Sequence, residues 1–328
     1  MVRPRVFVTR VIAQEGLDKI AEEAEAEVWP EEPPPPYEVL VEKAKDAEGL
    51  VTLVTDKIDA ALMDAAPKLK VVANMAVGFD NIDIIEAAKR HISVSNTPRV
   101  LTETTADFAF TLLMAGARRI VEADKYTKSG QWKTWGPKLL LGQDIYDSTL
   151  AIIGLGRIGV ELAKRAHGFN MRVLYNDAFR RSNATEKGLG LEFVPTLAEI
   201  LPMADFVTMH VPLLPQTRHL ISTAEFALMK PTAVFINCSR GPVVDQKALY
   251  QALKSKQIFA AAIDVTEPEP ISIDDPLLTL DNVIIAPHIA SSSFTTRINM
   301  ALMAADNLIA GLHSKPLPNS VIPEVLLT

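Results

Sequence analysis

Near the middle of the chain the sequence reads Leu150-Ala151-Ile152-Ile153-Gly154-Leu155-Gly156-Arg157-Ile158-Gly159-Val160. An apolar run typical of a buried strand leads into a Gly-x-Gly-x-x-Gly turn, and a helical pattern follows. In such a turn the first glycine permits the tight bend, the second lets the backbone approach a pyrophosphate, and the third lets helix and strand pack closely. The free N–H groups of the helix then face the phosphates. The stretch predicts a dinucleotide-binding turn, although the glycine pattern alone also fits a turn without a ligand.

An aspartate that lies about 20 residues further along supports this interpretation. The next apolar run, Arg172-Val173-Leu174-Tyr175-Asn176, ends at Asp177. A carboxylate at the tip of the second strand is where such folds hold a ribose 2′-hydroxyl. The alternative is a surface aspartate beside a strand-to-helix turn.

Length and composition exclude several classes of protein. The 328 residues suffice for two domains, and 48% hydrophobic with 22% charged residues is ordinary for a globular protein. The net charge of −7 argues against a nucleic-acid or anionic membrane surface. A single cysteine, Cys238, excludes an intrachain disulfide and fits a reducing compartment. The N-terminus lacks the apolar core of a signal peptide, and we expect a soluble, cytoplasmic protein.

Short apolar runs alternate with helical patterns along most of the chain, which is typical of βαβ units with parallel sheets. The first series of expected strands is Val6–Thr9, Glu27–Trp29, Gly49–Leu53, Lys70–Met75 and Ile92–Ser95. The second is Ala151–Ile153, Val173–Asn176, Asp205–Val211, Ala233–Asn237, Ala260–Asp264 and Val283–Ala286. Six strands are what a complete dinucleotide-binding fold requires. The sequence therefore predicts an α/β protein with two parallel sheets.

The dinucleotide-binding fold begins in mid-chain, so the residues before it form a separate α/β unit. One long helix is expected from about Thr102 to Ser129 and a last one over Ser293–Leu312, which returns to the first unit. We expect a discontinuous substrate domain of residues 1–99 with 291–328 and a dinucleotide-binding domain of residues 100–290. Small-ligand sites usually lie in domain clefts, which makes a cleft between the two the expected site.

Three residues that suit a redox reaction follow the ends of three expected strands. Arg240 follows Ala233–Asn237, Glu269 follows Ala260–Asp264, and His288 follows Val283–Ala286. Ligands of open parallel sheets bind beyond these carboxyl ends. Reduction of a 2-oxo acid needs a hydride at C2 and a proton on the carbonyl oxygen. Histidine can supply the proton, a neighbouring carboxylate favours its imidazolium form, and arginine offers a donor fork to the substrate carboxylate.

Each of these residues also has a structural explanation. Arg240 fits a surface ion pair, Glu269 an exposed loop acid, and His288 a histidine bonded to backbone, and only their combination favours catalysis. His210 ends a strand and can adjoin the cofactor or serve a structural role. The histidines show no metal-ligand spacing, and we expect no metal.

In the first unit, the run Asn74-Met75-Ala76-Val77-Gly78 also follows an expected strand. Gly78 would let backbone N–H groups face an anion, although a plain strand-to-helix turn fits equally well.

These motifs together resemble the D-isomer-specific 2-hydroxyacid dehydrogenase family over essentially the whole chain. The resemblance rests on Val77–Asn81, Thr102–Asp107, Gly154–Gly159, Arg240–Asp245, Glu269-Pro270 and Pro287-His288. Arg165–Met171 and Pro270–Leu278 are similar to its glyoxylate/hydroxypyruvate reductase branch, which includes 2-ketogluconate reductases. The resemblance implies a Rossmann domain inserted in a flavodoxin-like substrate domain. It also implies hydride transfer from NAD(P)H to glyoxylate, hydroxypyruvate or 2-ketogluconate, giving D-2-hydroxy acids, in a homodimer.

The same resemblance implies roles for single residues. His288 is the expected general acid/base, Glu269 its carboxylate partner, and Arg240 the substrate anchor, while the backbone of Val77 and Gly78 holds the substrate carboxylate. Trp135 is expected to reach the partner subunit's active site, although it also fits a packed loop aromatic. The expected cofactor contacts are Thr105, Gly154, Gly156, Arg157, Ile158, Gly159, Asp177, His210, Pro212, Cys238, Asp264 (at the nicotinamide amide) and Ala290.

The sequence departs from the family pattern at three places. Ala290 replaces the usual glycine after His288-Ile289, Thr266 replaces a common phenylalanine, and Asp177 stands where NADP-preferring members of the branch lack an acid. Because a carboxylate repels a 2′-phosphate, we expect NAD as the cofactor, with NADP as the alternative that the nearby Arg180 and Arg181 would favour. The competing functions are a 3-phosphoglycerate or phosphite dehydrogenase and an NAD-sensing corepressor.

Overall fold

The computed structural model describes residues 3–323. Residues 1–2 and 324–328, which the predicted first domain includes, lie outside the described part. The chain divides into two compact units, Met1–Leu101 with Ser292–Thr328 and Thr102–Ser291. The roles assigned to the domains of residues 1–99 with 291–328 and 100–290 remain predictions.

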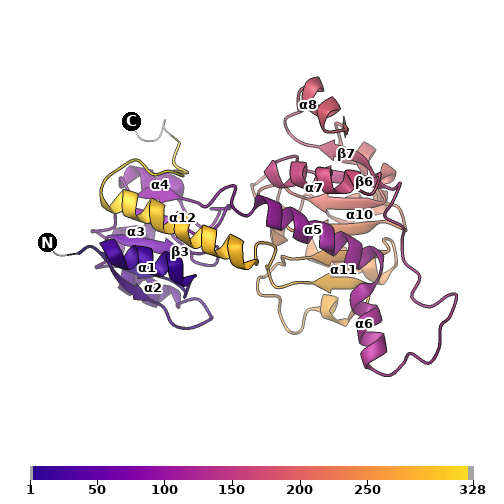
Figure 1. Cartoon of the computed structure of the whole chain (residues 1–328), viewed down its shortest axis with the longest axis horizontal. Coiled ribbons are helices and arrows are strands. Elements are labelled where there is room, and N and C mark those ends of the chain that lie inside the picture. The colour runs from indigo at the N-terminus through magenta and orange to yellow at the C-terminus, as the bar shows by residue number, and fades with distance from the viewer. Residues whose placement is uncertain (1–2, 324–328) are drawn as a thin grey trace. The chain divides into compact units, whose positions relative to one another are not determined.

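The first unit is built around a five-stranded parallel sheet (Figure 1). Its strand order, β2-β1-β3-β4-β5, is the flavodoxin-like order, as predicted. The strands are β1 (Arg5–Val8), β2 (Glu25–Val28), β3 (Gly49–Thr52), β4 (Val71–Asn74) and β5 (Ser93–Ser95). The helices are α1 (Gln14–Glu23), α2 (Tyr37–Ala44), α3 (Ala60–Ala65), α4 (Ile84–Lys89) and α12 (Phe294–Leu312), which returns to this unit as expected.

The second unit holds a seven-stranded parallel sheet in the order β12-β11-β10-β9-β6-β7-β8. Read from β8, this is the Rossmann order with one strand added at the far edge, so the predicted fold class is confirmed. The strands are β6 (Thr149–Ile153), β7 (Arg172–Asn176), β8 (Leu191–Phe193), β9 (Phe206–Met209), β10 (Val234–Asn237), β11 (Ala260–Ile263) and β12 (Val283–Ile285). The sequence predicted six of these. It missed β8, whose three residues are too few to show a strand period.

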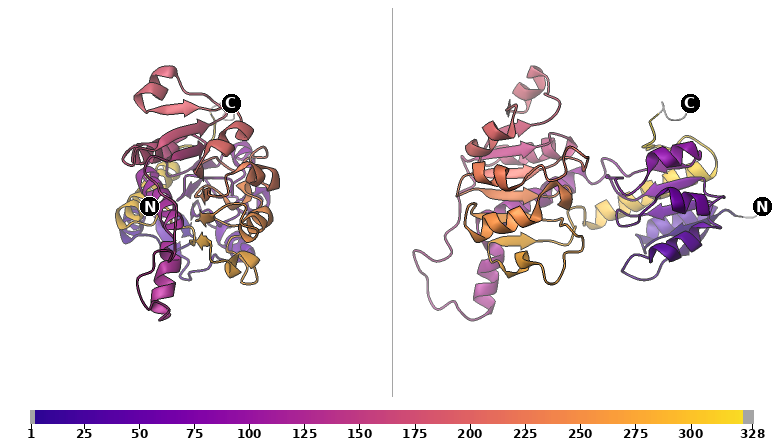
Figure 2. Two further views of the ribbon diagram at one scale, coloured as in Figure 1. Left: turned by 90° about the vertical axis from the view of Figure 1, so that its right-hand side faces the viewer. Right: turned by 180° about the vertical axis from the view of Figure 1, so that it is seen from behind.

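Helices cover both faces of the second sheet, as a parallel sheet requires (Figure 2). Along β6, Leu150 and Ile152 pack toward α5 (Thr102–Ala117) and α7 (Arg157–His167), while Ala151 and Ile153 pack toward the opposite helices. The helical segments that complete the unit are α8 (Asn183–Gly188), α9 (Leu197–Ile200), α10 (Thr223–Leu228), α11 (Gln246–Lys254) and the short 3-10 turns Leu201–Met203, Gly241–Val243 and Pro276–Thr279. The loops after β6, β7, β9, β10, β11 and β12 lie at the carboxyl edge of this sheet, and they carry most of the predicted site residues of the unit.

The prediction of one continuous helix over Thr102–Ser129 is wrong, because the segment forms two helices. Arg119 takes a left-handed backbone with φ 52°, which ends α5 and begins α6 (Ile120–Lys128). At the end of α5 the Ala117 carbonyl accepts the N–H of the distant Gln143 at 2.9 Å, and at the start of α6 the Arg119 guanidinium binds Glu122 at 2.8 and 2.7 Å. No residue of α6 is buried, and α6 with the following loop extends from the sheet of its unit (Figure 1).

Within residues 3–323, no helix combines the length and apolar character needed to cross a membrane.

Candidate active site

The glycine turn after β6 has the geometry that a pyrophosphate requires. Gly154 has φ 93°, and a Cβ there would lie 2.7 Å from the backbone of His210. A Cβ on Gly159 would lie 2.7 Å from the carbonyl oxygen of Gly154. At Gly156, by contrast, a Cβ would meet nothing within 4 Å. The outer glycines are therefore required by the packing of the protein on itself, whereas the middle one faces open space in front of the first residues of α7, Arg157 and Ile158.

We predict opposite effects for two substitutions in this turn. Gly156→Ala fills the space in front of the helix N-terminus, so the KM for NADH should rise about tenfold while the melting temperature stays unchanged. Gly159→Ala overpacks the backbone and should destabilise the fold by ~1–3 kcal/mol. Steady-state kinetics and thermal unfolding of both variants check this. Equal loss of stability in the two variants would contradict the assignment of Gly156 to the phosphates.

Asp177 lies against the same turn. Its carboxylate accepts the N–H of Leu155 at 2.7 Å and the N–H of Phe179 at 3.0 Å. The guanidinium of Arg181 donates to the carbonyl of Leu155. Asp177 and Arg181 thus hold the glycine turn from the tip of β7, beside the place where the fold binds a ribose.

Arg180, which was considered as a residue that would favour NADP, is paired with Glu186. Its guanidinium binds Glu186 through two nitrogens, each at 2.9 Å, and the hydroxyl of Tyr175 donates to the same carboxylate at 2.7 Å. The Arg180 guanidinium and the Tyr175 hydroxyl hold the pKa of Glu186 below its usual range.

Burial changes the pKa of two further predicted cofactor residues, His210 and Cys238. Burial lowers the pKa of His210 to about 4, so its ring is neutral at pH 7 and shares a 2.9 Å hydrogen bond with the Thr208 hydroxyl. Burial raises the pKa of the Cys238 thiol well above its usual range, which keeps the thiol protonated. The carbonyl of Pro212 accepts from Thr217 at 2.6 Å, and Thr105 is buried on α5. Trp135 lies in the loop after α6 and is 78% exposed.

His288 and Glu269, which the sequence predicts as general acid/base and carboxylate partner, are in direct contact. His288 Nδ1 lies 2.5 Å from Glu269 Oε1, and each side chain is about one-third exposed, at 30% and 33%. Burial raises the pKa of Glu269, but the hydrogen bond and charge of His288, with the charge of Arg240, outweigh this and hold it below its usual value. The carboxylate is ionised at neutral pH and contacts Nδ1, so Nε2 is the ring nitrogen that lies outside this contact.

Asp264 fixes the turn that carries His288. Its two carboxylate oxygens accept the N–H groups of Ile289 and Ala290, both at 2.8 Å, and its carbonyl accepts the His288 N–H at 2.9 Å. The backbone of His288 is left-handed, with φ 55°. Burial raises the pKa of Asp264, although the two backbone bonds oppose the rise. The sequence assigned Asp264 and Ala290 to the cofactor, and their role in holding this turn was not foreseen.

Arg240 is carried by a loop that packs unusually close to the loop of Glu269. A Cβ on Gly241 would lie 1.8 Å from the carbonyl oxygen of Thr266, so only glycine permits this approach. Asn237 shapes the loop: its amide donates to the Arg240 carbonyl at 2.9 Å, and its oxygen accepts the Ser239 N–H at 2.9 Å. Asn237 was not among the predicted site residues, although a polar residue at the end of a buried strand could have indicated its role.

We predict that Gly241→Ala separates these two loops. Because a misplacement of about 1 Å in a catalytic group costs on the order of 100-fold in rate, kcat should fall by about that factor. Gly188→Ala is the matched control, since a Cβ at that helical glycine meets nothing within 4 Å. Full activity in Gly241→Ala would show that the close loop contact has no catalytic importance.

Val77 and Gly78 belong to the other unit, where they lie in the loop after β4 and are half-buried. Within residues 3–323, no group of three or more His, Cys, Asp or Glu side chains is placed to hold a metal ion.

A glycine turn for a dinucleotide and a histidine–carboxylate pair on one Rossmann unit define a nicotinamide-dependent oxidoreductase. The family model for the NAD-binding domain of D-isomer-specific 2-hydroxyacid dehydrogenases matches residues 110–290. The chain belongs to this family, and it is an NAD(P)-dependent oxidoreductase.

The relatives that resemble the chain cover nearly all of it. It is 55% identical to a glyoxylate reductase of Korarchaeum cryptofilum, over 99% of this chain and 98% of the relative. It is 49% identical to a glyoxylate reductase of Thermococcus gammatolerans, over 99% and 98%. Among solved structures it resembles an NADPH-dependent glyoxylate/hydroxypyruvate reductase of Sinorhizobium meliloti in complex with NADP and malonate, with TM-score 0.86, 33% identity and 97% of each chain covered.

Proposed function

We propose that this protein reduces glyoxylate and related small 2-oxo acids to 2-hydroxy acids, of D configuration where C2 is chiral. The observation that carries the proposal is the 2.5 Å contact between His288 Nδ1 and Glu269 Oε1 on the dinucleotide-binding unit. The glyoxylate reductases that are 55% and 49% identical to the chain support the substrate class.

The chain's own residues account for the proton and the substrate charge. The ionised Glu269 stabilises the imidazolium of His288, whose Nε2 proton passes to the carbonyl oxygen of the substrate. Arg240 offers planar donors to the substrate carboxylate and polarises its carbonyl. The nicotinamide dinucleotide, when bound, supplies the hydride to C2. In the reverse direction His288 takes the proton back.

The range of substrates is the finer part of the proposal. Hydroxypyruvate and 2-ketogluconate are proposed beside glyoxylate on the resemblance of Arg165–Met171 and Pro270–Leu278 to that branch. A 3-phosphoglycerate or phosphite dehydrogenase and an NAD-sensing corepressor remain the competing functions, and no observation on the described residues favours them.

We predict NADH oxidation when the purified protein is mixed with glyoxylate, and turnover with hydroxypyruvate or 2-ketogluconate in the same assay. His288→Asn should lower kcat by a factor of ~10²–10⁴ with little change in NADH binding, measured by fluorescence titration. Asparagine is chosen because it tolerates the left-handed backbone at this position. His91→Asn replaces another histidine with positive φ and is the control. Absence of turnover of any 2-oxo acid with either NADH or NADPH would refute the proposed function.

We propose NAD as the preferred dinucleotide because the Asp177 carboxylate lies at the glycine turn and Arg180 is paired with Glu186. An anionic oxygen here repels a 2′-phosphate and accepts bonds from ribose hydroxyls.

Asp177→Asn should therefore raise the ratio of kcat/KM for NADPH to that for NADH by about tenfold or more, since one charge repulsion of ~1–2 kcal/mol is removed. Asp274→Asn, which removes an exposed acid from the same unit, should leave the ratio unchanged. A wild-type protein that prefers NADPH would contradict the assignment.

We propose a cytoplasmic homodimer that acts on small molecules and binds neither nucleic acid nor membrane. The segment after α6 supports self-association, because Trp132, Trp135 and Leu141 are 57%, 78% and 61% exposed there. Trp135 is the proposed contact with the partner subunit's active site. Light scattering of the purified protein reports the oligomeric state.

A further inference from the structure

Three consecutive carbonyl groups after β4 are held by buried donors. The carbonyl of Ala76 accepts the Thr97 N–H at 2.7 Å, and that of Val77 accepts the side-chain amide of Asn96 at 2.8 Å. The carbonyl of Gly78 accepts the side-chain amide of Asn74 at 3.0 Å. All three bonds lie within the first unit, at the carboxyl ends of β4 and β5.

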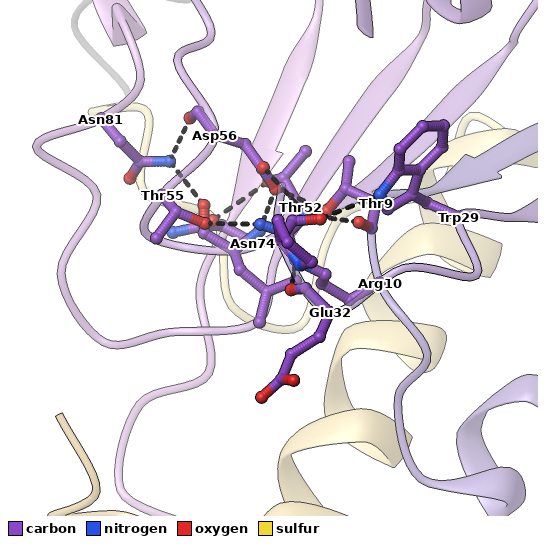
Figure 3. A network of polar contacts seen from close by, with 11 residues as sticks. Thr9, Arg10, Trp29, Glu32, Thr52, Thr55, Asp56, Asn74 and Asn81 are labelled. Atoms are coloured by element: carbon purple, nitrogen blue, oxygen red, sulfur yellow. Dashed lines mark hydrogen bonds and ion pairs between the residues drawn. The ribbon is translucent and has the colours of Figure 1, made fainter. Parts of the chain in front are cut away.

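The donors are themselves fixed. Thr97 and Asn74 are fully buried and Asn96 is 9% exposed. The hydroxyl of Thr52, at the end of β3, donates to the amide oxygen of Asn74 at 3.0 Å, which determines the direction in which the Asn74 NH₂ group points. Figure 3 shows Thr52 and Asn74 in a polar network with Asp56 and Asn81.

Holding a carbonyl also aims an N–H group. A trans peptide is planar, so its N–H points opposite to its C=O. The bonds to the carbonyls of Ala76, Val77 and Gly78 therefore direct the N–H groups of Val77, Gly78 and Phe79 away from the donors. Within residues 3–323, none of these three N–H groups donates a hydrogen bond to the protein, and all three residues are partly exposed.

We infer that Asn96 and Asn74 are positioning residues, which set the peptide planes of residues 76–79 so that their N–H groups bind the carboxylate of the 2-oxo acid. Successive N–H groups that point to one side form a concave anion site without any charged side chain. The inference rests on the proposed function for the identity of the acid. Asn96 holds the Val77 carbonyl and so orients the N–H of Gly78. Asn74 holds the Gly78 carbonyl and so orients the N–H of Phe79. Thr52 orients the side-chain amide of Asn74.

The decisive variant is Asn96→Asp, which keeps the shape of the side chain but replaces the donor by an acceptor that repels the Val77 carbonyl. Loss of a buried hydrogen bond that leaves its partner unsatisfied weakens binding by about tenfold to a hundredfold. The KM for glyoxylate should therefore rise by about this factor. The KM for NADH should stay within about twofold, since the cofactor turn lies in the other unit. Asn96→Ser, whose hydroxyl can still donate, should recover part of the loss.

Asn307→Asp is the matched control. Asn307 is fully buried in α12 of the same unit, its amide donates to the Met303 carbonyl at 2.8 Å and to the Asn319 side-chain oxygen at 3.1 Å, and its own oxygen accepts the Asn319 N–H at 2.9 Å. This variant places the same chemical change in the same unit, so it should lower the melting temperature without raising the KM for glyoxylate. Equal KM values for wild type and Asn96→Asp, or an equal KM rise in Asn307→Asp, would overturn the inference.

A second measurement does not depend on turnover. Oxamate, a stable analogue of a 2-oxo acid, is titrated into the ¹⁵N-labelled full-length protein with NADH present, and amide resonances are followed by TROSY NMR. The largest shifts within residues 71–101 should fall on Val77, Gly78 and Phe79, and they should be reduced in Asn96→Ser. Unshifted amides at these residues would overturn the inference even in an active enzyme. If the amides of Val77, Gly78 and Phe79 shift in a protein that does not turn over glyoxylate, the anion site is supported and only the proposed substrate is refuted.

Discussion

One buried carboxylate holds the catalytic turn together. Asp264 directly follows β11 and is 1% exposed, and its side chain accepts two successive N–H groups of the neighbouring loop, those of Ile289 and Ala290. A left-handed histidine costs on the order of 1 kcal/mol or more, and hydrogen bonds that a carboxylate accepts from backbone N–H groups offset such strain. The position of His288, and with it the pairing with Glu269, depends on this contact.

In both units, side-chain amides donate hydrogen bonds to loop carbonyls and so fix the backbone conformation of those loops. Asn237 shapes the loop of Arg240, and the missing side chain of Gly241 lets that loop approach the loop of Glu269. In the first unit, Asn74 and Asn96 hold the carbonyls of residues 77 and 78. Buried amides suit this task because they satisfy donors and acceptors without adding a charge to the interior.

The sequence predicted the α/β fold class, because apolar runs and a glycine turn are local patterns, while the Rossmann and flavodoxin-like folds of the two units were implied by the family resemblance. The break at Arg119 was missed because the end of α5 is bonded to Gln143, a residue far along the chain. The strand Leu191–Phe193 was missed because it is too short to show a period. The pairing of His288 with Glu269 followed from strand ends that share one edge. Asp264 and Asn96 fix backbone that lies 25 and 19 residues away along the chain, and no local pattern records such contacts. Asn237 bonds within its own loop, so its place at the end of a buried strand was a local signal.

The central claim is that the Glu269 carboxylate holds the His288 ring through Nδ1, so that Nε2 is left to exchange a proton with the substrate. The most direct test compares kcat for glyoxylate reduction in wild type, Glu269→Gln and Glu269→Ala. Glutamine keeps a side-chain oxygen that can accept the Nδ1 proton, whereas alanine leaves Nδ1 without this partner. We predict that kcat falls on the order of 100-fold or more in Glu269→Ala and less in Glu269→Gln. A wild-type kcat in Glu269→Ala would contradict the claim.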